Sequence, residues 1–374
     1  MDISIPREVR SREHRVGLTP LGVKALVQNG HRVFVESGAG VAAGHPDADY
    51  ESAGAQVVFN RSEALGRGEL VFSILAPDAR EYARLAPRQI MMAFWALAIA
   101  RPEDVRVLVE RQITAIGLEA IEDEHGRAPV LTSMSEIAGA LAVTVGAGLL
   151  LNEFGGKGIL MGGVPGVAPA NLVILGAGVL GRAAAQAALG MGAQVTLLDV
   201  SVGHLREALA QLRSPVTTYV ATRPNLEKTL AFADLVLGAV AVHGQRAPVL
   251  VTRPMLKLMK PRSVVMDLSI DMGGCLETSR PTAFPEAVYE VDGILHFCVP
   301  NLPAAAARSS SVALTNAVLP YLLEVGSAEA EAALSSHDDL RRGTYLYRGL
   351  CAQESLARAF DLVRGPLPWA ASGP

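Results

Sequence analysis

The chain has 374 residues, of which 50% are hydrophobic and 19% are charged, and its formal net charge at pH 7 is −4. This length is enough for two domains of ~100–200 residues each. The slightly acidic balance argues against a nucleic-acid partner. Three cysteines, Cys275, Cys298 and Cys351, lack metal-ligand spacing, and an odd number forms no complete disulfide framework. We therefore expect a cytoplasmic protein with no metal site.

The first 130 residues alternate short apolar segments with helical ones. Strands are expected at 3–5, 32–35, 56–58, 70–73, 90–92 and 114–118. Thr19 and Pro20 are typical of an N-cap and a first-turn proline, and Gly30 of a helix end. The N-terminal segment reads as the first strand and lacks the form of a signal peptide. The alternation predicts a doubly wound α/β domain.

A long apolar segment at 135–151 opens the second domain. Its longest apolar stretch is shorter than the ~20 residues that a membrane helix needs, and glycines interrupt it, so we expect a buried helix between the domains and no membrane contact. Further strands are expected at 172–175, 194–198, 235–238, 264–267 and 296–298, and C-terminal helices without partner strands at 312–325 and 345–362.

These elements predict two doubly wound α/β domains, the second being a Rossmann domain inserted into the first. The first part of the substrate domain is expected at 1–130 and the nucleotide-binding domain at 131–305. The C-terminal helices at 306–374 are expected to return to the substrate domain.

The most informative segment is Gly-Ala-Gly-Val-Leu-Gly at 176–181. It follows the apolar strand at 172–175 and precedes an Ala-rich helix at 182–191. The next strand ends at Asp199. Strand, glycine turn, helix, strand and acid form the dinucleotide-binding fingerprint in its full context.

Each position of the fingerprint has a physical reason. Gly176 permits the tight turn and Gly178 lets the backbone approach a pyrophosphate. Gly181 lets the helix pack closely on the strand. Val179 and Leu180 open the helix, whose first N–H groups are offered to the phosphates. The alternative is a glycine-rich helix start that serves packing alone.

Asp199 also predicts which cofactor binds. Its carboxylate accepts hydrogen bonds from an adenosine ribose and repels a 2′-phosphate. The segment 200–202 supplies no arginine to receive such a phosphate, and Arg206 falls in the next helix, where a solvated charge is expected. The cofactor is therefore predicted to be NAD rather than NADP.

Longer motifs resemble the alanine dehydrogenase and transhydrogenase group over nearly the whole chain. They are Pro6-Arg7-Glu8, Glu13-His14-Arg15-Val16-Gly17-Leu18-Thr19-Pro20, Met134-Ser135-Glu136-Ile137-Ala138-Gly139, Leu160-Met161-Gly162-Gly163-Val164-Pro165-Gly166-Val167, Asp267-Leu268-Ser269-Ile270-Asp271-Met272-Gly273-Gly274-Cys275, Ser279-Arg280-Pro281-Thr282, Cys298-Val299-Pro300-Asn301-Leu302-Pro303 and Ala313-Leu314-Thr315-Asn316-Ala317. The resemblance implies NAD-dependent interconversion of alanine with pyruvate and ammonia, and a homo-oligomer, a hexamer.

The resemblance also implies roles for single residues. Arg15 corresponds to the arginine that clamps the substrate carboxylate, Asp271 to the catalytic aspartate beside the nicotinamide, and Asn301 to a pocket residue. The plainer alternatives are a surface arginine, a turn cap and a turn residue. NAD contacts are implied for Ser135, Asp199 and Leu268, and Asp271 is a further candidate.

The stretch 238–244 is expected to approach the cofactor, which makes Val240 a further candidate for binding it. His243 lies in the same stretch. It is either a proton-transfer group or, as is commoner for a lone histidine, a structural or solvated residue.

Two residues that the resemblance predicts are replaced. The substrate-binding lysine falls at Leu75 and the catalytic histidine at Ala96. Losing a charge-assisted hydrogen bond costs ~1.5–3 kcal/mol, and losing a positioned general acid costs about 10²–10⁴ in rate. With Trp95, these residues predict a less polar and roomier pocket, for a substrate larger or less polar than pyruvate.

Three functions remain open at this point. The chain is an NAD-dependent oxidoreductase acting on an amino or imino acid that is not alanine, an alanine dehydrogenase with substitute residues, or a catalytically weak NAD-binding homologue. Retention of Arg15, Asp271 and Asn301 favours the first over the third. A proton-pumping transhydrogenase subunit is disfavoured, because the segment 267–275 resembles the dehydrogenases.

Overall fold

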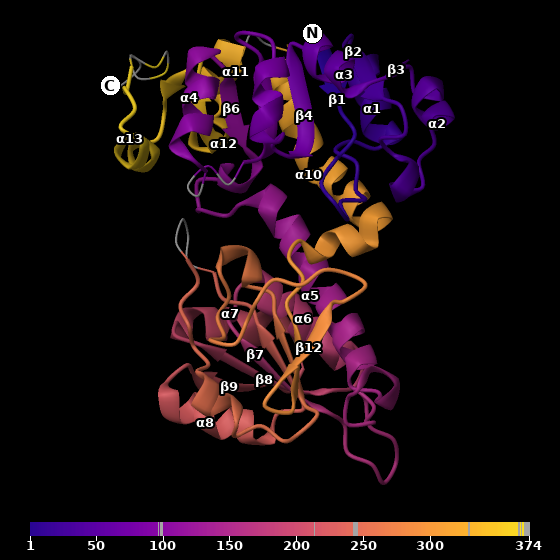
Figure 1. Cartoon of the computed structure of the whole chain (residues 1–374), viewed down its shortest axis with the longest axis vertical. Helices are drawn as coiled ribbons and strands as arrows, with labels where there is room; N and C mark the ends of the chain where they lie inside the picture. Colours follow the sequence, from indigo (N-terminus) through magenta and orange to yellow (C-terminus); the bar gives the residue numbers. More distant parts are fainter. Residues whose placement is uncertain are drawn as a thin grey trace. The chain divides into compact units, whose positions relative to one another are not determined.

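The chain divides into two compact units in a computed structural model. The model describes all residues except 96, 98, 99, 213, 242–245, 328, 329, 366, 368 and 370–374, and except the side chains of 79, 330 and 355. The first unit comprises Met1–Met134 and Ala304–Pro374, and the second comprises Ser135–Pro303 (Figure 1). The first unit is therefore formed by two separate stretches of the chain, and the second by the stretch between them.

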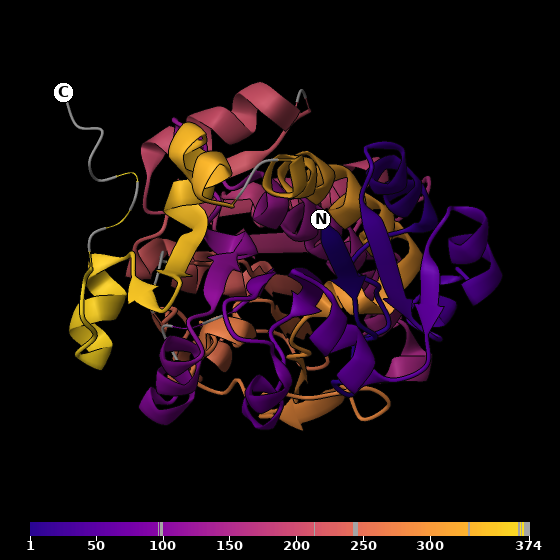
Figure 2. The same cartoon turned by 90° about the horizontal axis from the view of Figure 1, so that it is seen from above.

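The first unit is built on a sheet that has eight strands in the described residues, in the order β15-β14-β6-β5-β4-β1-β2-β3. The strands are β1 Asp2–Ile5, β2 Arg32–Glu36, β3 Gln56–Val58, β4 Leu70–Leu75, β5 Ile90–Phe94, β6 Thr114–Gly117, β14 Thr344–Tyr347 and β15 Leu350–Cys351. Strands β1 to β6 are parallel in the doubly wound order 3-2-1-4-5-6. Figure 2 shows α2 and β3 at one edge and the C-terminal elements at the other.

Helices cover this sheet because its central strands are apolar on both faces. The α-helices of the unit are α1 Pro20–Gln28, α2 Asp47–Ser52, α3 Arg61–Arg67, α4 Pro102–Glu110, α10 Ala307–Ser327, α11 Ala330–Ser336, α12 Asp338–Gly343 and α13 Glu354–Phe360. Short 3-10 turns are η1 Val41–Ala43, η2 Ala79–Arg84 and η4 Leu118–Ala120. In β4, five successive residues are buried before Leu75.

The second unit repeats the doubly wound order, with seven strands within its described residues arranged as β12-β13-β11-β10-β7-β8-β9. They are β7 Asn171–Leu175, β8 Gln194–Asp199, β9 Thr217–Val220, β10 Leu235–Gly238, β11 Val264–Asp267, β12 Val288–Val291 and β13 Ile294–Phe297. The α-helices are α6 Val179–Gly190, α7 Val202–Leu212, α8 Arg223–Phe232 and α9 Arg253–Leu256, with η5 Asn152–Phe154, η6 Ile270–Met272 and η7 Leu302–Ala306. The two-domain α/β architecture predicted from the sequence is confirmed.

The prediction of a C-terminal helix over 345–362 is wrong. The segment forms the hairpin β14–β15, and only Glu354–Phe360 is helical. Thr and Tyr, which make up most of β14, favour a strand. Arg348 and Gly349, both with positive φ, make the tight turn of the hairpin. Strand β14 pairs antiparallel with β6, so this part of the chain does have a partner strand and closes one edge of the sheet.

The strand expected at 296–298 is likewise longer and paired. It runs Ile294–Phe297 and forms an antiparallel hairpin with β12. The turn is Asp292-Gly293, in which both residues have positive φ. Asp-Gly is a favoured two-residue hairpin turn, a signal that the sequence analysis did not use.

The long apolar helix, α5, runs Pro129–Leu149 and begins six residues before the predicted start. At 21 residues it is the one helix in the described chain that is long and apolar enough, by length and composition alone, to cross a membrane. This corrects the expectation that it would be too short. Ala142, Val143 and Leu149 of this helix are buried in the hydrophobic core of the second unit, as in core helices of globular domains.

Candidate functional site

The glycine turn of the second unit joins β7 to α6. Gly176 has φ +105°, a conformation that side-chain-bearing residues rarely adopt. A Cβ on Gly181 would collide with the Gly176 carbonyl oxygen, whereas a Cβ on Gly178 would meet nothing within 4 Å. Helix α6 starts at Val179 and Leu180, directly after this open space. The three glycines therefore fit the turn, approach and packing roles of a pyrophosphate site.

Asp199 ends β8, the strand next to β7, and is 9% exposed. Its Oδ2 accepts a hydrogen bond from the Ala177 N–H at 2.8 Å, and its Oδ1 accepts one from the Ser201 N–H at 2.7 Å. His204 Nδ1 lies 3.3 Å from the same Oδ1. The carboxylate is thus fixed beside the glycine turn. Arg206 is exposed on α7.

The preference for NAD can be measured directly. We expect the protein to bind NAD more tightly than NADP, and Asp199→Asn to narrow that gap by at least about tenfold, because a charge-assisted hydrogen bond contributes ~1.5–3 kcal/mol. Calorimetric titration of both variants with both nucleotides gives the ratio. Equal or tighter NADP binding by the unmodified protein would refute the role of Asp199.

The ends of β10 and β11 lie beside the same turn. The strands are parallel, so their carboxyl ends share the sheet edge at which β7 meets Gly176. The Val240 N–H donates to Ser269 Oγ at 2.9 Å, and the Leu268 N–H donates to the Gly238 carbonyl at 2.9 Å. Val240 and Leu268 are thereby brought together with the fingerprint. His243 lies outside the described residues.

Asp267 organises the loop that carries Asp271, a role the sequence analysis missed. It is fully buried, and its carboxylate accepts hydrogen bonds from the Cys275 N–H at 2.8 Å, the Ser269 N–H at 3.0 Å and Ser279 Oγ at 2.6 Å. A buried carboxylate that ties down backbone N–H groups fixes a loop. The available signals were its position at the end of a buried strand and at the start of a motif that resembles the family.

We expect Asp267→Ala to lower the free energy of unfolding by ~3 kcal/mol or more, since several buried N–H groups lose their acceptor at ~1–3 kcal/mol each. Urea denaturation of the purified protein measures this. The matched control is Glu227→Ala, which removes an exposed ion pair with Arg223 in the same unit and should cost no more than ~1 kcal/mol. A loss for Asp267→Ala no larger than the control would contradict the anchoring role.

Asp271 and Asn301 are neighbours in the second unit. Asp271 lies in η6, and its Oδ2 accepts a hydrogen bond from the Asn301 N–H at 3.2 Å. Asn301 has φ +53°, a left-handed conformation that asparagine tolerates better than most residues. Both residues make further polar interactions. Ser135 is half-buried on α5.

The cysteines offer no nucleophile in this region. All three are free and buried. Burial, with the nearby Asp267 carboxylate, raises the pKa of the Cys275 thiol well above its usual range, so it stays protonated and acts as a small packing residue. No cluster of His, Cys, Asp and Glu in the described residues could hold a metal ion.

Arg15 belongs to the first unit, in the loop after β1, and is not a surface residue. It is 3% exposed, and its guanidinium donates from Nε to Glu13 Oε1 at 2.8 Å and from Nη2 to Glu13 Oε2 at 2.7 Å. Its Nη1 lies 3.2 Å from Met134 Sδ. The bidentate pair holds the buried guanidinium in one orientation. Glu13 was not predicted as a site residue, although it belongs to a motif that resembles the family.

Leu75 ends β4, and Trp95 directly follows the end of the neighbouring strand β5. Leu75 is half-buried. Trp95 was expected to face the substrate, but its ring is 5% exposed, packs against Tyr82, and donates its indole N–H to the Ile116 carbonyl at 3.1 Å. The Trp95 backbone N–H points to the Glu119 carboxylate at 3.2 Å. Ala96 lies outside the described residues.

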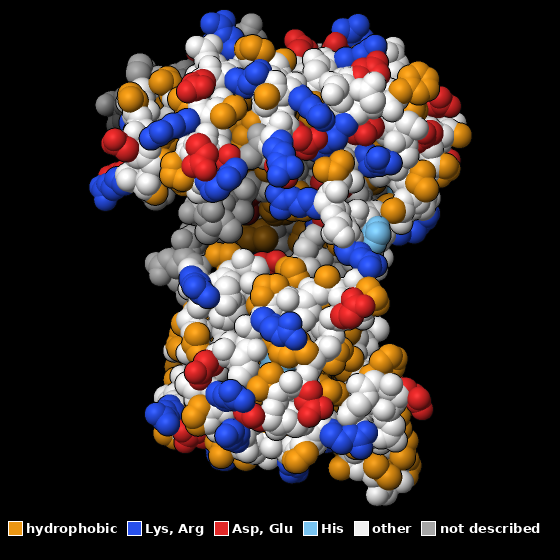
Figure 3. Space-filling model, in the orientation of Figure 1, with side chains coloured by type: hydrophobic (Ala, Val, Ile, Leu, Met, Phe, Trp, Pro, Cys, Tyr) orange, Lys and Arg blue, Asp and Glu red, His pale blue; other side chains and the backbone are white. Residues whose placement is uncertain are grey.

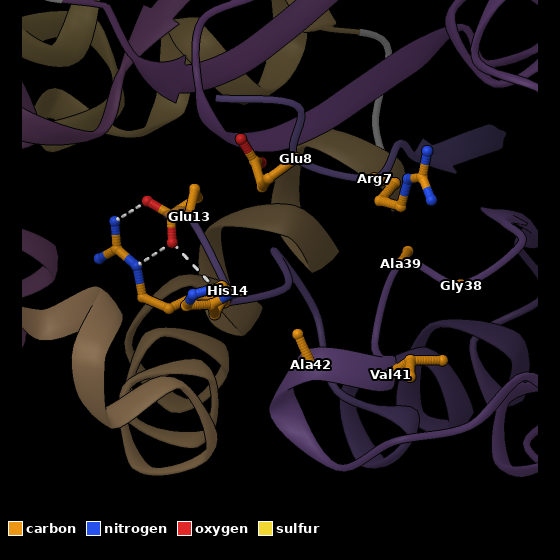
Figure 4. Close-up of a pocket in the computed structure, with 9 residues that line it drawn as sticks. Arg7, Glu8, Glu13, His14, Gly38, Ala39, Val41 and Ala42 are labelled. Carbon is orange, nitrogen blue, oxygen red and sulfur yellow. Dashed lines mark hydrogen bonds and ion pairs between the residues drawn. The ribbon is translucent and has the colours of Figure 1, made fainter. Parts of the chain in front are cut away.

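A pocket of about 350 Å³ opens beside Arg15 in the first unit. It is lined by Arg7, Glu8, Glu13, His14, Arg15, Gly38, Ala39, Val41 and Ala42. Figure 4 shows Glu13 and His14 on one side, Arg7 on the other, and Glu8 between them. On each unit, the face shown in Figure 3 mixes acidic and basic side chains without a continuous basic surface.

Two family models cover most of the chain. "Alanine dehydrogenase/PNT, N-terminal domain" matches residues 4–138 and "Alanine dehydrogenase/PNT, C-terminal domain" matches 142–354. An alanine dehydrogenase of Halomonas elongata is 42% identical over 97% of both chains, and one of Mycobacterium tuberculosis is 41% identical over 96% of both.

Solved structures agree with these matches. A structure of L-alanine dehydrogenase has a TM-score of 0.91 and 40% identity, and the match covers 96% of this chain and 99% of that one. A transhydrogenase from Sinorhizobium meliloti has a TM-score of 0.80 and 25% identity, over 95% of this chain and all of the other.

Proposed function

Because the chain belongs to the alanine dehydrogenase/PNT family, we propose that it transfers hydride between NAD(H) and an amino or imino acid other than alanine. Its general class is that of an NAD-dependent amino-acid dehydrogenase. What we propose beyond this class is the identity of the substrate. The observation that carries it is the end of β4, where Leu75 stands in the slot for which the family resemblance predicts a cationic lysine.

The chain's own residues supply the rest of the site. We assign Arg15 to the substrate carboxylate, because Glu13 holds its guanidinium in one orientation and the residue lines the pocket of the first unit. We assign Asp271 to the substrate nitrogen, which is cationic in the ammonium and iminium forms, and Asn301 to positioning Asp271 through its backbone N–H. NAD, when bound, supplies the hydride acceptor or donor.

A preformed imine explains how such a site works without the expected lysine and histidine. Reduction of a ketone with ammonia needs a polarised carbonyl and a proton donor for the departing water. A substrate that arrives as an imine or iminium has already lost that water. Such a substrate needs neither a polarised carbonyl nor a proton for departing water, so the roles assigned to Arg15 and Asp271 are limited to binding its carboxylate and its nitrogen.

The test is a screen of NADH oxidation. Substrates are 2-oxo acids of increasing side-chain size with ammonia, the same acids with primary amines, and cyclic imines that carry a carboxylate. We expect a cyclic imine or a larger oxo acid to exceed pyruvate with ammonia in kcat/KM. Pyruvate as the best substrate would favour an alanine dehydrogenase with substitute residues, as the names of the relatives suggest. Tight NAD binding with no turnover would favour the non-catalytic homologue.

We also propose that the chain forms a homo-oligomer, a hexamer by resemblance. Phe154, Leu160, Val164 and Val167 of the second unit are 49–60% exposed, and burying such side chains against another copy is favourable. Light scattering at micromolar concentration should give a mass several times the 39.3 kDa of one chain. A monomer under these conditions would refute the assembly.

A further inference from the structure

The loop after β1 lies at the topological switch point of the first unit. Strands β1 and β4 are adjacent and parallel, and the strand order reverses between them. Ligands of doubly wound sheets bind outside the carboxyl ends of the strands at this point. The pocket of about 350 Å³ is lined by this loop, and its volume is within the range of small-molecule sites.

Glu8 lies in the loop after β1 and its carboxylate contacts the end of β4. Its Oε1 accepts a hydrogen bond from the Ile74 N–H at 2.7 Å, and its Oε2 lies 3.4 Å from the Leu75 N–H. These contacts hold the carboxylate at the end of β4. The side chain at that strand end, Leu75, brings no charge to it.

No basic side chain in the described part of the chain forms an ion pair with Glu8. Arg61 on α3 has a longer-range electrostatic effect on Glu8. Its own ion pairs are with Glu81, at 2.5 Å, and with Glu36, at 3.9 Å. Arg15 is paired with Glu13 at 2.7 Å. Among the described residues, Glu8 is therefore a carboxylate that lines a ligand-sized pocket and has no counter-ion.

The lack of a counter-ion has an electrostatic consequence. Burial, reinforced by the Glu13 carboxylate, raises the pKa of Glu8 to about 7, although the two backbone N–H groups and Arg61 oppose the rise. His14, Arg7 and Arg15 are the other charged or titratable groups that line the pocket. Near neutral pH, Glu8 is thus divided between its two protonation states, and an arriving cation would stabilise the ionised one.

We infer that Glu8 determines substrate specificity by pairing with a second cationic group of the substrate, so that diamino acids are preferred over neutral amino acids of the same length. This inference rests on the proposed function and names its substrate class. A carboxylate paired across a pocket with a ligand ammonium, with Arg15 at the ligand carboxylate, gives the substrate two opposite charges to bind.

Matched substrate pairs test the inference. NADH formation is measured with L-2,4-diaminobutyrate and L-2-aminobutyrate, with L-ornithine and L-norvaline, and with L-lysine and L-norleucine. In the unmodified protein we expect at least one diamino acid to exceed its neutral partner tenfold or more in kcat/KM. Glu8→Gln should reduce that ratio at least tenfold. Glu110→Gln, which removes an exposed carboxylate on α4, should leave it unchanged.

Leu75→Lys provides an independent variant. It places an ammonium on the strand end whose N–H lies 3.4 Å from Glu8, so Glu8 gains a counter-ion within the protein. The preference for the diamino acid should then fall as in Glu8→Gln, while the neutral amino acids keep or gain activity. This variant retains the Glu8 side chain and its bonds to β4, so a folding defect of Glu8→Gln cannot imitate the result.

Proton release gives a readout besides turnover. The best diamino acid is titrated into the NADH complex by calorimetry at pH 7 in two buffers of different ionisation enthalpy. Ionisation of Glu8 on binding should release up to about half a proton per site, and Glu8→Gln should abolish this release.

Several outcomes would overturn the inference. They are a preference for the neutral member of every pair, an equal loss for both members in Glu8→Gln, and the absence of both binding and turnover for every diamino acid. The proposed function fails in a different way, namely if no amino or imino acid supports NAD reduction or NADH oxidation.

Discussion

The Leu75→Lys/Ala96→His double variant should oxidise L-alanine at least 100-fold faster than the unmodified protein. The lysine restores a charge-assisted hydrogen bond to the substrate carboxylate, for which ~1.5–3 kcal/mol is typical. The histidine restores a positioned acid–base group, for which a factor of about 10²–10⁴ is typical. Steady-state NADH formation with saturating NAD measures the gain.

A matched control separates chemistry from pocket size. Leu75→Met/Ala96→Gln has side chains of comparable length without the ammonium and the imidazole, and it should remain slow with alanine. Equal alanine activity in the two double variants would show that the pocket, and not the lost polar groups, limits the reaction. Fast alanine oxidation already present in the unmodified protein would leave nothing for the substitutions to restore.

Replacing Arg15 should have the second large effect. Arg15→Met leaves Glu13 buried beside a neutral side chain, and breaking a buried ion pair on one side costs ~3–5 kcal/mol of stability. The substrate carboxylate also loses its cation, so kcat/KM should fall at least 100-fold. Urea denaturation and steady-state kinetics on the same preparation measure the two effects. Arg106→Met on α4, where the arginine is exposed, is the control and should change neither.

The double variant Glu13→Gln/Arg15→Met separates the role of Arg15 in stability from its role in binding the substrate. Removing both charges relieves the unpaired carboxylate and should recover most of the lost free energy of unfolding. The substrate still lacks its cation, so kcat/KM should stay low. Recovery of activity together with stability would mean that Arg15 only supports the loop, and would contradict its contact with substrate.

Much of the fold could be predicted because its signals are local. The buried parallel strands are short apolar runs, and β10 and β11 begin and end at the predicted residues. The hairpin β14–β15 could not be found in the same way. Its two strands are short and show no clear alternation of apolar and polar residues. Strand β14 is stabilised by pairing with β6, which lies more than 220 residues earlier in the chain.

The residues of the candidate site likewise fall into those that local sequence predicts and those whose role depends on the fold. The glycines of the fingerprint and Asp199 are recognisable because strand, turn and helix follow one another in sequence. Glu8 and Glu13 belong to motifs of the family resemblance, but the sequence predicted no role for either residue. Their importance comes from burial and from partners supplied by the fold, namely the backbone of β4 for Glu8 and the guanidinium of Arg15 for Glu13.

The central claim is that alanine is not the substrate for which this site is built. The most direct measurement is kcat for L-alanine in the unmodified protein at saturating NAD, set beside kcat for the best substrate of the imine and oxo-acid screen. We predict a value for alanine at least 100-fold below that of the best substrate. Turnover of alanine at an ordinary enzymatic rate, on the order of 10 s⁻¹, with no better substrate in the screen, would contradict the claim.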